Sequence, residues 1–468
     1  MNREELLAAF KKGDVTAAEL MQRIRNGNRR SASPLSEGQK GLWLLDKLQP
    51  GSSAYNLPAC WRAEGAGDAM ALTNALTSTF AEHPVLTALI REQDGAPVLV
   101  ERPGMLGTVQ EHDARALNEE QLLDQLRALV AEPFSLQTGP LMRAHLLHRQ
   151  EEHVVLVVVH HIVADGRSMQ LLVQSLLRAA GQINPGEAPS APVPATRYAD
   201  FVAWEQALLA GEDGRRHLAY WQQQLAQPLP VLELPGEQST SRPPHGIQGR
   251  THSLQLDAET HARLRALATS LRVSPAVLFL AVYKLLLQRY SGQHELIVGM
   301  PSVGRPEPRF EDVAGYFINM VPVRSCQDPQ ASFAHFAREL QLTLADGLDH
   351  AAYPFPALVR ALKVPRTAGH PPIFQVAYEY QSASVMGELP AGEDTSAGDR
   401  IRPIPGLHQE GEYELVLEVY EQAQGYAVHL KHDARRFSIP AIQRLGQHLL
   451  NLLHSVLEQP ELALSRHD

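Results

Sequence analysis

The chain has 468 residues, 44% of them hydrophobic, and a formal charge of −10 at pH 7, which is typical of a globular protein with two or three domains. The acidic balance, the absence of basic tracts and the lack of a long apolar stretch argue against nucleic-acid binding and against a membrane span. The two cysteines, Cys60 and Cys326, cannot build a disulfide framework, so we expect a cytoplasmic protein with both thiols in its core.

The first 33 residues read as a short helical leader. Apolar residues recur at helical spacing over residues 6–10 and again over 17–24, which predicts two short amphipathic helices. Two such helices cannot bury their apolar faces by themselves. The leader therefore either packs on the body of the protein or serves as a docking element for a partner.

The body of the chain falls into two halves. Residues 34–185 alternate helical and strand patterns, and a connecting segment at 186–250 is rich in loop-forming residues. The pattern then restarts in residues 251–468. The elements expected there are helices at 257–271 and 274–290, a strand at 294–300, a hairpin over 413–433 and a final amphipathic helix. Mixed strands and helices in two successive halves predict an α/β fold with a ligand cleft between the halves.

The most informative stretch is VVLVVVHHIVADGRSMQLLV, which begins at Val154. Six apolar residues predict a strand covered on both faces, and the apolar spacing from Met169 onward predicts a helix after a tight turn. Asp165 can cap this helix, and Gly166 allows another group to approach the backbone. His161 would stand beside the unpaired N–H groups of a helix start, which suits a general base next to developing negative charge.

Simpler interpretations of this stretch compete with catalysis. A histidine near a core is most often a structural residue with its hydrogen bonds satisfied. His161 and Asp165 have the i, i+4 spacing of two metal ligands, but no third ligand accompanies them, so we expect no metal. Asp165 and Gly166 could simply end a turn and cap a helix.

The segment HHIVADG at 160–166 resembles the active-site motif of condensation domains from nonribosomal peptide and mixed polyketide assembly lines. Further matches follow in the order of that family, from residue 34 to the end of the chain. They are SEGQKGLWLL from Ser36, YADFVAW from Tyr198, GRPEPRFEDVAGYFINMVPVR from Gly304, YPF from Tyr353 and HPPIFQV from His370. The resemblance implies two chloramphenicol acetyltransferase-like halves in a V-shape, with a tunnel between them.

The resemblance also implies roles for the motif residues. His161 would accept the proton of an attacking amine or hydroxyl as it adds to an acyl thioester. The backbone N–H of Gly166 would help to hold the oxyanion. Asp165 would be structural and paired with Arg305, while His160 would lie near the site without an assigned role. Two further residues, Ser302 and Asn319, are candidates for the lining of the tunnel.

The implied partner is an acyl or peptidyl carrier protein that presents the acyl group on its phosphopantetheine arm, so that the chain itself binds no cofactor. No adenylation, thioesterase or carrier domain fits within the sequence, and we expect a free-standing monomer that acts in trans. The acceptor would be carried by a second protein or would be a soluble small molecule. The sequence leaves open the acyl donor, the acceptor and whether an ester or an amide is formed.

A catalytically silent module is the alternative function, because degenerate relatives recruit a partner enzyme without catalysis. The intact histidine motif favours the enzyme. Departures from the family pattern concern other positions, where this chain has Gly41, Glu82, Thr87 and the group Ala351, Ala352 and Pro356. These departures weaken the expectation of an ordinary amino-acyl donor.

Overall fold

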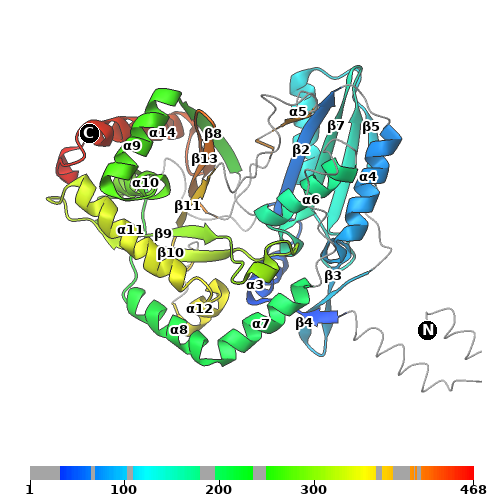
Figure 1. Cartoon of the computed structure of the whole chain (residues 1–468), viewed down its shortest axis with the longest axis horizontal. Coiled ribbons are helices and arrows are strands. Elements are labelled where there is room, and N and C mark those ends of the chain that lie inside the picture. Colours follow the sequence, from blue (N-terminus) through cyan, green and yellow to red (C-terminus); the bar gives the residue numbers. More distant parts are fainter. Residues whose placement is uncertain are drawn as a thin grey trace, which may run out of the picture.

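The computed structural model describes residues 32–64, 69–102, 109–179, 196–235, 249–364, 371–382, 401–404, 406–407 and 413–467. The predicted leader lies outside these residues, apart from its last two positions. Two lobes stand side by side (Figure 1). Each lobe has its own sheet and its own buried apolar core.

The N-terminal lobe is built on a five-stranded sheet in the order β12-β2-β7-β6-β5. Its central strand, β7, is the predicted valine strand, and every residue from Val154 to His160 is buried. A small sheet in the order β1-β4-β3 lies beside it. The elements of this lobe are β1 (Ala32–Pro34), α3 (Glu37–Leu48), β2 (Asn56–Glu64), α4 (Ala69–Glu82), β3 (Leu89–Gln93), β4 (Ala96–Val100), β5 (Val109–Asp113), α5 (Glu119–Ala131), β6 (Met142–His148), β7 (Glu152–His160) and α6 (Gly166–Ala179).

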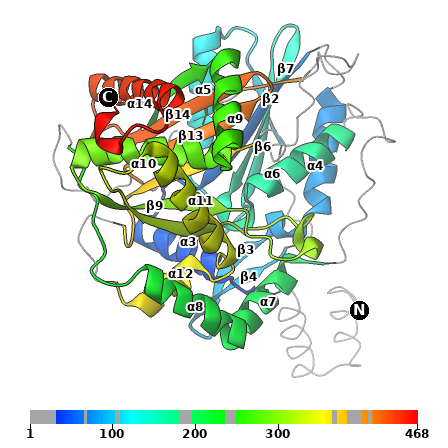
Figure 2. The same cartoon turned by 60° about the vertical axis from the view of Figure 1, so that its left-hand side comes forward.

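The C-terminal lobe is built on a six-stranded sheet in the order β10-β9-β11-β13-β14-β8. Helices α9, α10, α11 and α14 cover its outer face (Figures 1 and 2). The predicted helices and the predicted hairpin, β13 with β14, are present. The elements of this lobe are β8 (Gly249–Leu256), α9 (Ala258–Leu271), α10 (Pro275–Ser291), β9 (Glu295–Ser302), β10 (Asn319–Cys326), α11 (Phe333–Asp349), α12 (Phe355–Leu362), β11 (Val376–Gln381), β13 (Leu415–Gln422), β14 (Gly425–Asp433) and α14 (Ile439–Glu458).

Three segments cross between the lobes. Helices α7 (Tyr198–Ala210) and α8 (Glu212–Gln224) follow one another, with Phe201 of α7 in the N-terminal core and Trp221 of α8 in the C-terminal core. Strand β12 (Ile401–Pro403) comes late in the chain yet pairs with β2 of the N-terminal sheet. Between β9 and β10 the chain leaves its own lobe and buries Phe310 and Phe317 in the N-terminal core. The last of these segments brings residues of the C-terminal half to the turn after β7, where Arg305 and Phe317 contact Asp165.

One expectation about the cysteines is wrong. Cys60 is buried in the N-terminal core, as predicted, whereas Cys326 is exposed. Cys326 is the last residue of β10, where the strand leaves the sheet and the core no longer covers its side chains. Among the described residues, no single helix is long and apolar enough to cross a membrane. Helices α9 and α10 reach that length and apolar composition only when taken together, and their axes are bent by 97° relative to each other.

Candidate active site

The end of strand β7 turns through a short 3-10 helix, His161–Val163, before α6 begins. His160 caps this turn, because its Nδ1 accepts a hydrogen bond of 3.1 Å from the N–H of Ile162. Burial lowers the pKa of His160 to about 3. His160 is therefore a neutral, structural imidazole that cannot take up a proton near neutral pH.

His161 is held at both its backbone and its ring. Its N–H donates to the carbonyl of Tyr55 at 2.7 Å, and its Nδ1 lies 2.7 Å from the carbonyl of Ala164. A carbonyl only accepts, so Nδ1 carries the proton and Nε2 has a free lone pair. Nε2 forms no hydrogen bond with the described residues. It is also not fully buried, so a substrate can reach it.

The protonation state of His161 follows from its surroundings. Burial lowers its pKa below the usual value of 6.5, and the hydrogen bond to Ala164 and the charge of Asp165 oppose this effect. The imidazole is thus neutral at neutral pH, which a general base requires. The ring of Tyr316 meets the ring of His161 edge-on, with centroids 5.1 Å apart, and fixes its orientation.

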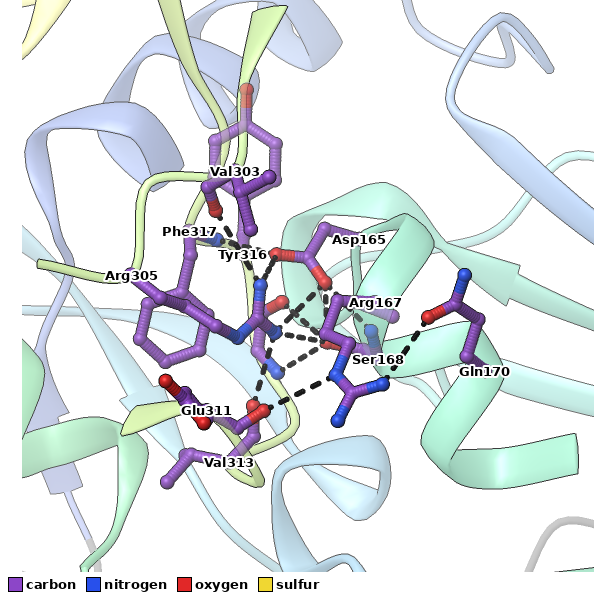
Figure 3. Close-up of polar contacts among 12 residues, drawn as sticks. Asp165, Arg167, Ser168, Gln170, Val303, Arg305, Glu311, Val313, Tyr316 and Phe317 are labelled. Atoms are coloured by element: carbon purple, nitrogen blue, oxygen red, sulfur yellow. Dashed lines mark hydrogen bonds and ion pairs between the residues drawn. The ribbon is translucent and has the colours of Figure 1, made fainter. Parts of the chain in front are cut away.

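Asp165 joins the two lobes. It is 1% exposed, and its carboxylate forms a bidentate pair with the guanidinium of Arg305 at 2.8 and 3.0 Å. Figure 3 shows Arg305 reaching from the segment between β9 and β10 to the start of α6. Asp165 also caps α6, because it accepts from the N–H of Ser168 at 2.8 Å. The predicted pair is therefore in contact, and Asp165 has no free oxygen for a substrate.

Ser168 completes this buried network. Its hydroxyl donates to Asp165 at 2.7 Å or to the carbonyl of Gly315 at 2.9 Å, and it accepts from the N–H of Gly315 at 3.0 Å. Asp165 accepts one more bond, from the N–H of Phe317 at 3.2 Å. The guanidinium of Arg305 lies over the ring of Phe317, with Cζ of Arg305 4.3 Å from the centroid of that ring. The crossing segment is thus fastened to the turn that carries His161.

Gly166 is the first residue of α6, and its backbone N–H has no acceptor among the described residues. Such groups at a helix start bind negative charge. A Cβ added at Gly166 would meet nothing within 4 Å, so packing gives no reason for glycine at this position. Open space and a free donor together suit the oxyanion position.

We expect Gly166→Ala to fold normally and to lose activity. The added methyl group contacts no protein atom within 4 Å, so the melting temperature should stay close to that of the wild type. The methyl group would occupy the space next to the free N–H and hinder the approach of the oxyanion, and turnover should fall by up to about a thousandfold, the upper end of the loss when one oxyanion donor is removed. Thermal melting and acyl-transfer rates check the two halves of this prediction, and an unchanged rate would contradict it.

Comparisons with known proteins identify the family and the fold of the chain. The family model described as "Condensation domain" matches residues 29–468. The chain belongs to the condensation-domain family. The polyketide synthase PksN of Bacillus subtilis (strain 168) is 40% identical over 436 residues, which are 93% of this chain and 8% of that protein. The chain thus spans less than a tenth of that relative.

Solved structures show the same fold. The X-domain from teicoplanin biosynthesis superimposes with a TM-score of 0.80 at 25% identity, over 93% of this chain and 97% of that one. That X-domain has also been solved in complex with OxyB. The condensation domain of the Monacolin K polyketide synthase MokA matches with a TM-score of 0.79 at 20% identity, over 92% and 99% of the two chains. The predicted α/β, chloramphenicol acetyltransferase-like fold is confirmed.

In this condensation domain the two candidate tunnel residues use their polar groups within the protein. The Asn319 amide donates to the carbonyls of Ala351 and Tyr353, each at 2.7 Å, and accepts from the N–H of Phe355 at 2.7 Å. The Ser302 hydroxyl donates to the carbonyl of Asn319 at 3.1 Å. Both residues shape the end of the C-terminal sheet, and both N–H groups of the Asn319 amide already donate within the protein.

A cavity of about 320 Å³ lies between the lobes. Its walls are the starts of α3 and α12, the middle of α7, the ends of β9 and α11, and the crossing segment. Ser302, Asn319 and Arg305 line it, and so does Tyr316, whose ring also touches His161. Within the described part of the chain, no group of three or more His, Cys, Asp or Glu residues could hold a metal ion.

Several departures from the family pattern lie around this cavity. Ala351 and Ala352 line it directly. Gly41 packs against Pro356, since a Cβ at position 41 would lie only 3.2 Å from Cγ of that proline. The contact joins α3 of the N-terminal lobe to α12 of the C-terminal lobe. Positions 41, 351, 352 and 356 therefore lie where the two lobes meet.

Sequence reasoning missed residues that hold the site together. Gln39 is fully buried, and its amide donates to the carbonyl of Ile162 at 2.8 Å, inside the 3-10 turn. Gln39 also forms a capping box with Ser36 at the start of α3. The hydroxyl of Tyr198 lies 2.6 Å from the carbonyl of Tyr316 and 2.9 Å from Ser36 Oγ. The sequence signal for these roles was the resemblance of their segments to family motifs.

Proposed function

We propose that this condensation domain transfers an acyl group from a carrier-protein thioester to an amine or hydroxyl acceptor, with the acyl chain delivered in trans. The observation that carries the proposal is the neutral imidazole of His161. Its Nε2 is free, and it follows directly on β7 and precedes the unpaired N–H of Gly166. A base and an oxyanion donor on one short turn are the two groups that acyl transfer requires.

The proposed reaction uses no group beyond these. Nε2 takes the proton of the acceptor as the acceptor's nitrogen or oxygen forms a bond to the thioester carbon. The oxyanion of the tetrahedral intermediate accepts the Gly166 N–H. The C–S bond then breaks, and the imidazolium returns its proton to the departing thiolate of the phosphopantetheine arm. The products are an amide or ester and a carrier protein with a free thiol.

Mass spectrometry of a panel of acylated carrier proteins tests this function. Each carrier is incubated with the enzyme and with matched amines and alcohols, and both the intact carrier and the small-molecule fraction are weighed. We expect at least one carrier to lose its acyl mass while an acyl-acceptor product of equal amount appears. If the acyl group moves only onto a substrate held by a second carrier, the function is chain elongation with a carrier-bound acceptor.

A recruiting role without catalysis is the second candidate. The observation that favours it is the likeness to the teicoplanin X-domain, a protein solved in complex with OxyB. Such a module would bind carriers or a tailoring enzyme whether or not its histidine is present. Equal carrier turnover by the wild type and by enzyme-free buffer, together with tight binding of a partner, would favour this second function.

A further inference from the structure

Tyr316 belongs to the crossing segment between β9 and β10, and it is the aromatic neighbour of His161 that this segment supplies. The two rings meet at an interplanar angle of 86°, with their centroids 5.1 Å apart. In Figure 3 the side chain of Tyr316 points away from the pair of Asp165 and Arg305. One residue of the C-terminal half thus contacts the proposed base directly, while the ion pair beside it only holds the segment in place.

The backbone at Tyr316 is fixed by its surroundings. The N–H groups of its two neighbours, Gly315 and Phe317, donate to the buried network at the start of α6, at 3.0 and 3.2 Å. Between them, the carbonyl of Tyr316 accepts from the hydroxyl of Tyr198 in α7 at 2.6 Å. Three consecutive residues are therefore anchored to the N-terminal lobe. The ring of Tyr316 can move only by rotation about its own side-chain bonds.

Gly38 of α3 lies against the ring of Tyr316. A Cβ added at Gly38 would lie 2.6 Å from Cε1 and 3.0 Å from Cδ1 of that ring. Nonbonded carbon atoms pack at about 3.5–4.0 Å, so the present position of the ring excludes any side chain at position 38. Since the backbone of Tyr316 is anchored, a methyl group at this position would force the ring to turn. Gly38 therefore leaves the space in which the ring rests against His161.

The start of α3 is fixed to the same turn as His161. Gln39, next to Gly38, is fully buried and donates to the carbonyl of Ile162 at 2.8 Å. Gln39 also forms the capping box of α3 with Ser36. A shift of the helix that made room for a methyl group would break these contacts. The steric demand of a side chain at position 38 therefore falls on the ring of Tyr316.

The hydroxyl group of Tyr316 takes no part in this packing. It forms no hydrogen bond with the described residues, and it is not one of their fully buried polar atoms. Tyr316 also lines the cavity between the lobes, so its hydroxyl group is open to that space. The contact with His161 is therefore made by the ring. Phenylalanine at position 316 would keep this contact, and alanine would remove it.

The imidazole of His161 has to keep one orientation to act as a base. Its Nδ1 is held by the carbonyl of Ala164 at 2.7 Å, which leaves Nε2 for the acceptor. A half-turn of the ring would exchange Nδ1 with Cδ2 and Nε2 with Cε1, so that a carbon atom would face the acceptor. The edge-on contact with Tyr316 is a favourable aromatic geometry that such a turn would disturb. A single hydrogen bond and this contact together define the position of Nε2.

We propose that Tyr316 is a positioning residue for His161 and that Gly38 is required for this role. Helix α3 of the N-terminal lobe limits the ring of Tyr316, and this ring limits the imidazole. The effect on acyl transfer rests on the proposed function, whereas the effect on the imidazole can be measured without any substrate. The protein thus holds its base by packing and keeps Nε2 open.

NMR of the full chain with nitrogen-15-labelled histidine tests the proposal without substrate. The chain has 21 histidines, so the signals of His161 are identified by their loss in His161→Ala. In the wild type and in Tyr316→Phe we expect a neutral ring with its proton on Nδ1, which faces the carbonyl of Ala164. In Tyr316→Ala the ring gains freedom, and its nitrogen shifts should move toward the average of the two tautomers. Unchanged shifts in Tyr316→Ala would overturn the proposal.

Kinetics of the same variants give a second readout. Tyr316→Phe should keep kcat within about twofold, and Tyr316→Ala should lower kcat by about tenfold to a hundredfold with a smaller change in KM, as a reacting group misplaced by about 1 Å does. Gly38→Ala should lower kcat in the wild type but not further in Tyr316→Ala, where the added methyl group meets no ring. The matched control is Gly446→Ala in α14, where the added Cβ would lie 3.1 Å from the side chain of His252. It should leave both readouts unchanged.

Three kinetic results would also overturn the proposal: a Gly38→Ala enzyme with the wild-type rate, losses from Gly38→Ala and Tyr316→Ala that add in full, or a Tyr316→Phe enzyme as impaired as Tyr316→Ala. If melting curves show that Gly38→Ala does not fold, the two variants of Tyr316 decide. The expected nitrogen shifts without any acyl transfer would contradict the proposed function and leave the positioning role standing. Acyl transfer with unchanged shifts in Tyr316→Ala would do the reverse.

Discussion

His161→Ala should lower acyl-transfer turnover by a factor on the order of 10² to 10⁴, the usual contribution of a positioned general base. The neutral ring presents a free Nε2 because Nδ1 is committed to the carbonyl of Ala164. Without this base, the acceptor must lose its proton to water during the attack. Steady-state release of the carrier thiol at neutral pH measures the effect.

A histidine of β7, the strand that precedes the His161 turn, provides the control. His153 near the start of β7 is half-buried and pairs with His148, at 3.2 Å between their Nδ1 atoms. His153→Ala should keep a rate close to that of the wild type. Melting curves of both variants exclude unfolding as the cause. A His161→Ala enzyme with a wild-type rate would remove this residue from the chemistry.

Asp165→Ala should destabilise the fold by about 3–5 kcal/mol, the typical result of removing one partner from a buried ion pair. The variant leaves the guanidinium of Arg305 buried without its anion, since that side chain is only 4% exposed. It also removes the cap of α6 and the acceptor of the Phe317 N–H. Chemical denaturation of the purified variant measures the loss, and activity should fall with stability.

An exposed ion pair between the same two segments serves as the control. Arg167 of α6 reaches Asp312 of the crossing segment at 3.4 Å, with side chains 34% and 58% exposed. Asp312→Ala should cost at most about 1 kcal/mol. In a double-mutant cycle, Asp165→Ala and Arg305→Ala together should cost less than the sum of the single changes. If Asp165→Ala has the same free energy of unfolding as the wild type and is inactive, Asp165 has a direct chemical role.

Local patterns predicted much of the fold. The valine strand, the helix after it and the hairpin at 413–433 were found at or near their predicted positions, because their apolar periodicity reflects the face that is buried. The contact of Asp165 with Arg305 spans 140 residues. No periodicity could predict it, and it came from the family resemblance alone.

The burial of charged residues was harder to predict from the sequence, although the spacing of apolar residues in the helices gave an indication of it. Residues 198, 201, 202 and 205 follow the i, i+3, i+4, i+7 spacing of one helical face, and all four are buried. A glutamate on that face marks a special environment. Lys284 lies in the same way within the apolar run of α10, fully buried, where its amine donates to the carbonyls of Leu296 and Val323. Which partners meet such groups depends on strands distant in sequence.

The crossing of β12 to the N-terminal sheet was also beyond local reasoning. A three-residue strand carries too little pattern to reveal its partner, and it pairs with β2 from more than 300 positions away along the chain. The same holds for Gln39, whose amide supports the histidine turn from the start of α3. Such contacts follow from the packing of the two lobes as a whole.

The measurement that tests the central claim most directly follows one acylated carrier protein by intact mass in parallel reactions with the wild type and with His161→Ala. The wild type should remove the acyl mass and yield an equal amount of acylated acceptor. The variant should do so on the order of 10² to 10⁴ times more slowly. Equal rates in the two reactions would contradict the role of His161, and a carrier that keeps its acyl group with the wild type and every acceptor would contradict the transfer itself.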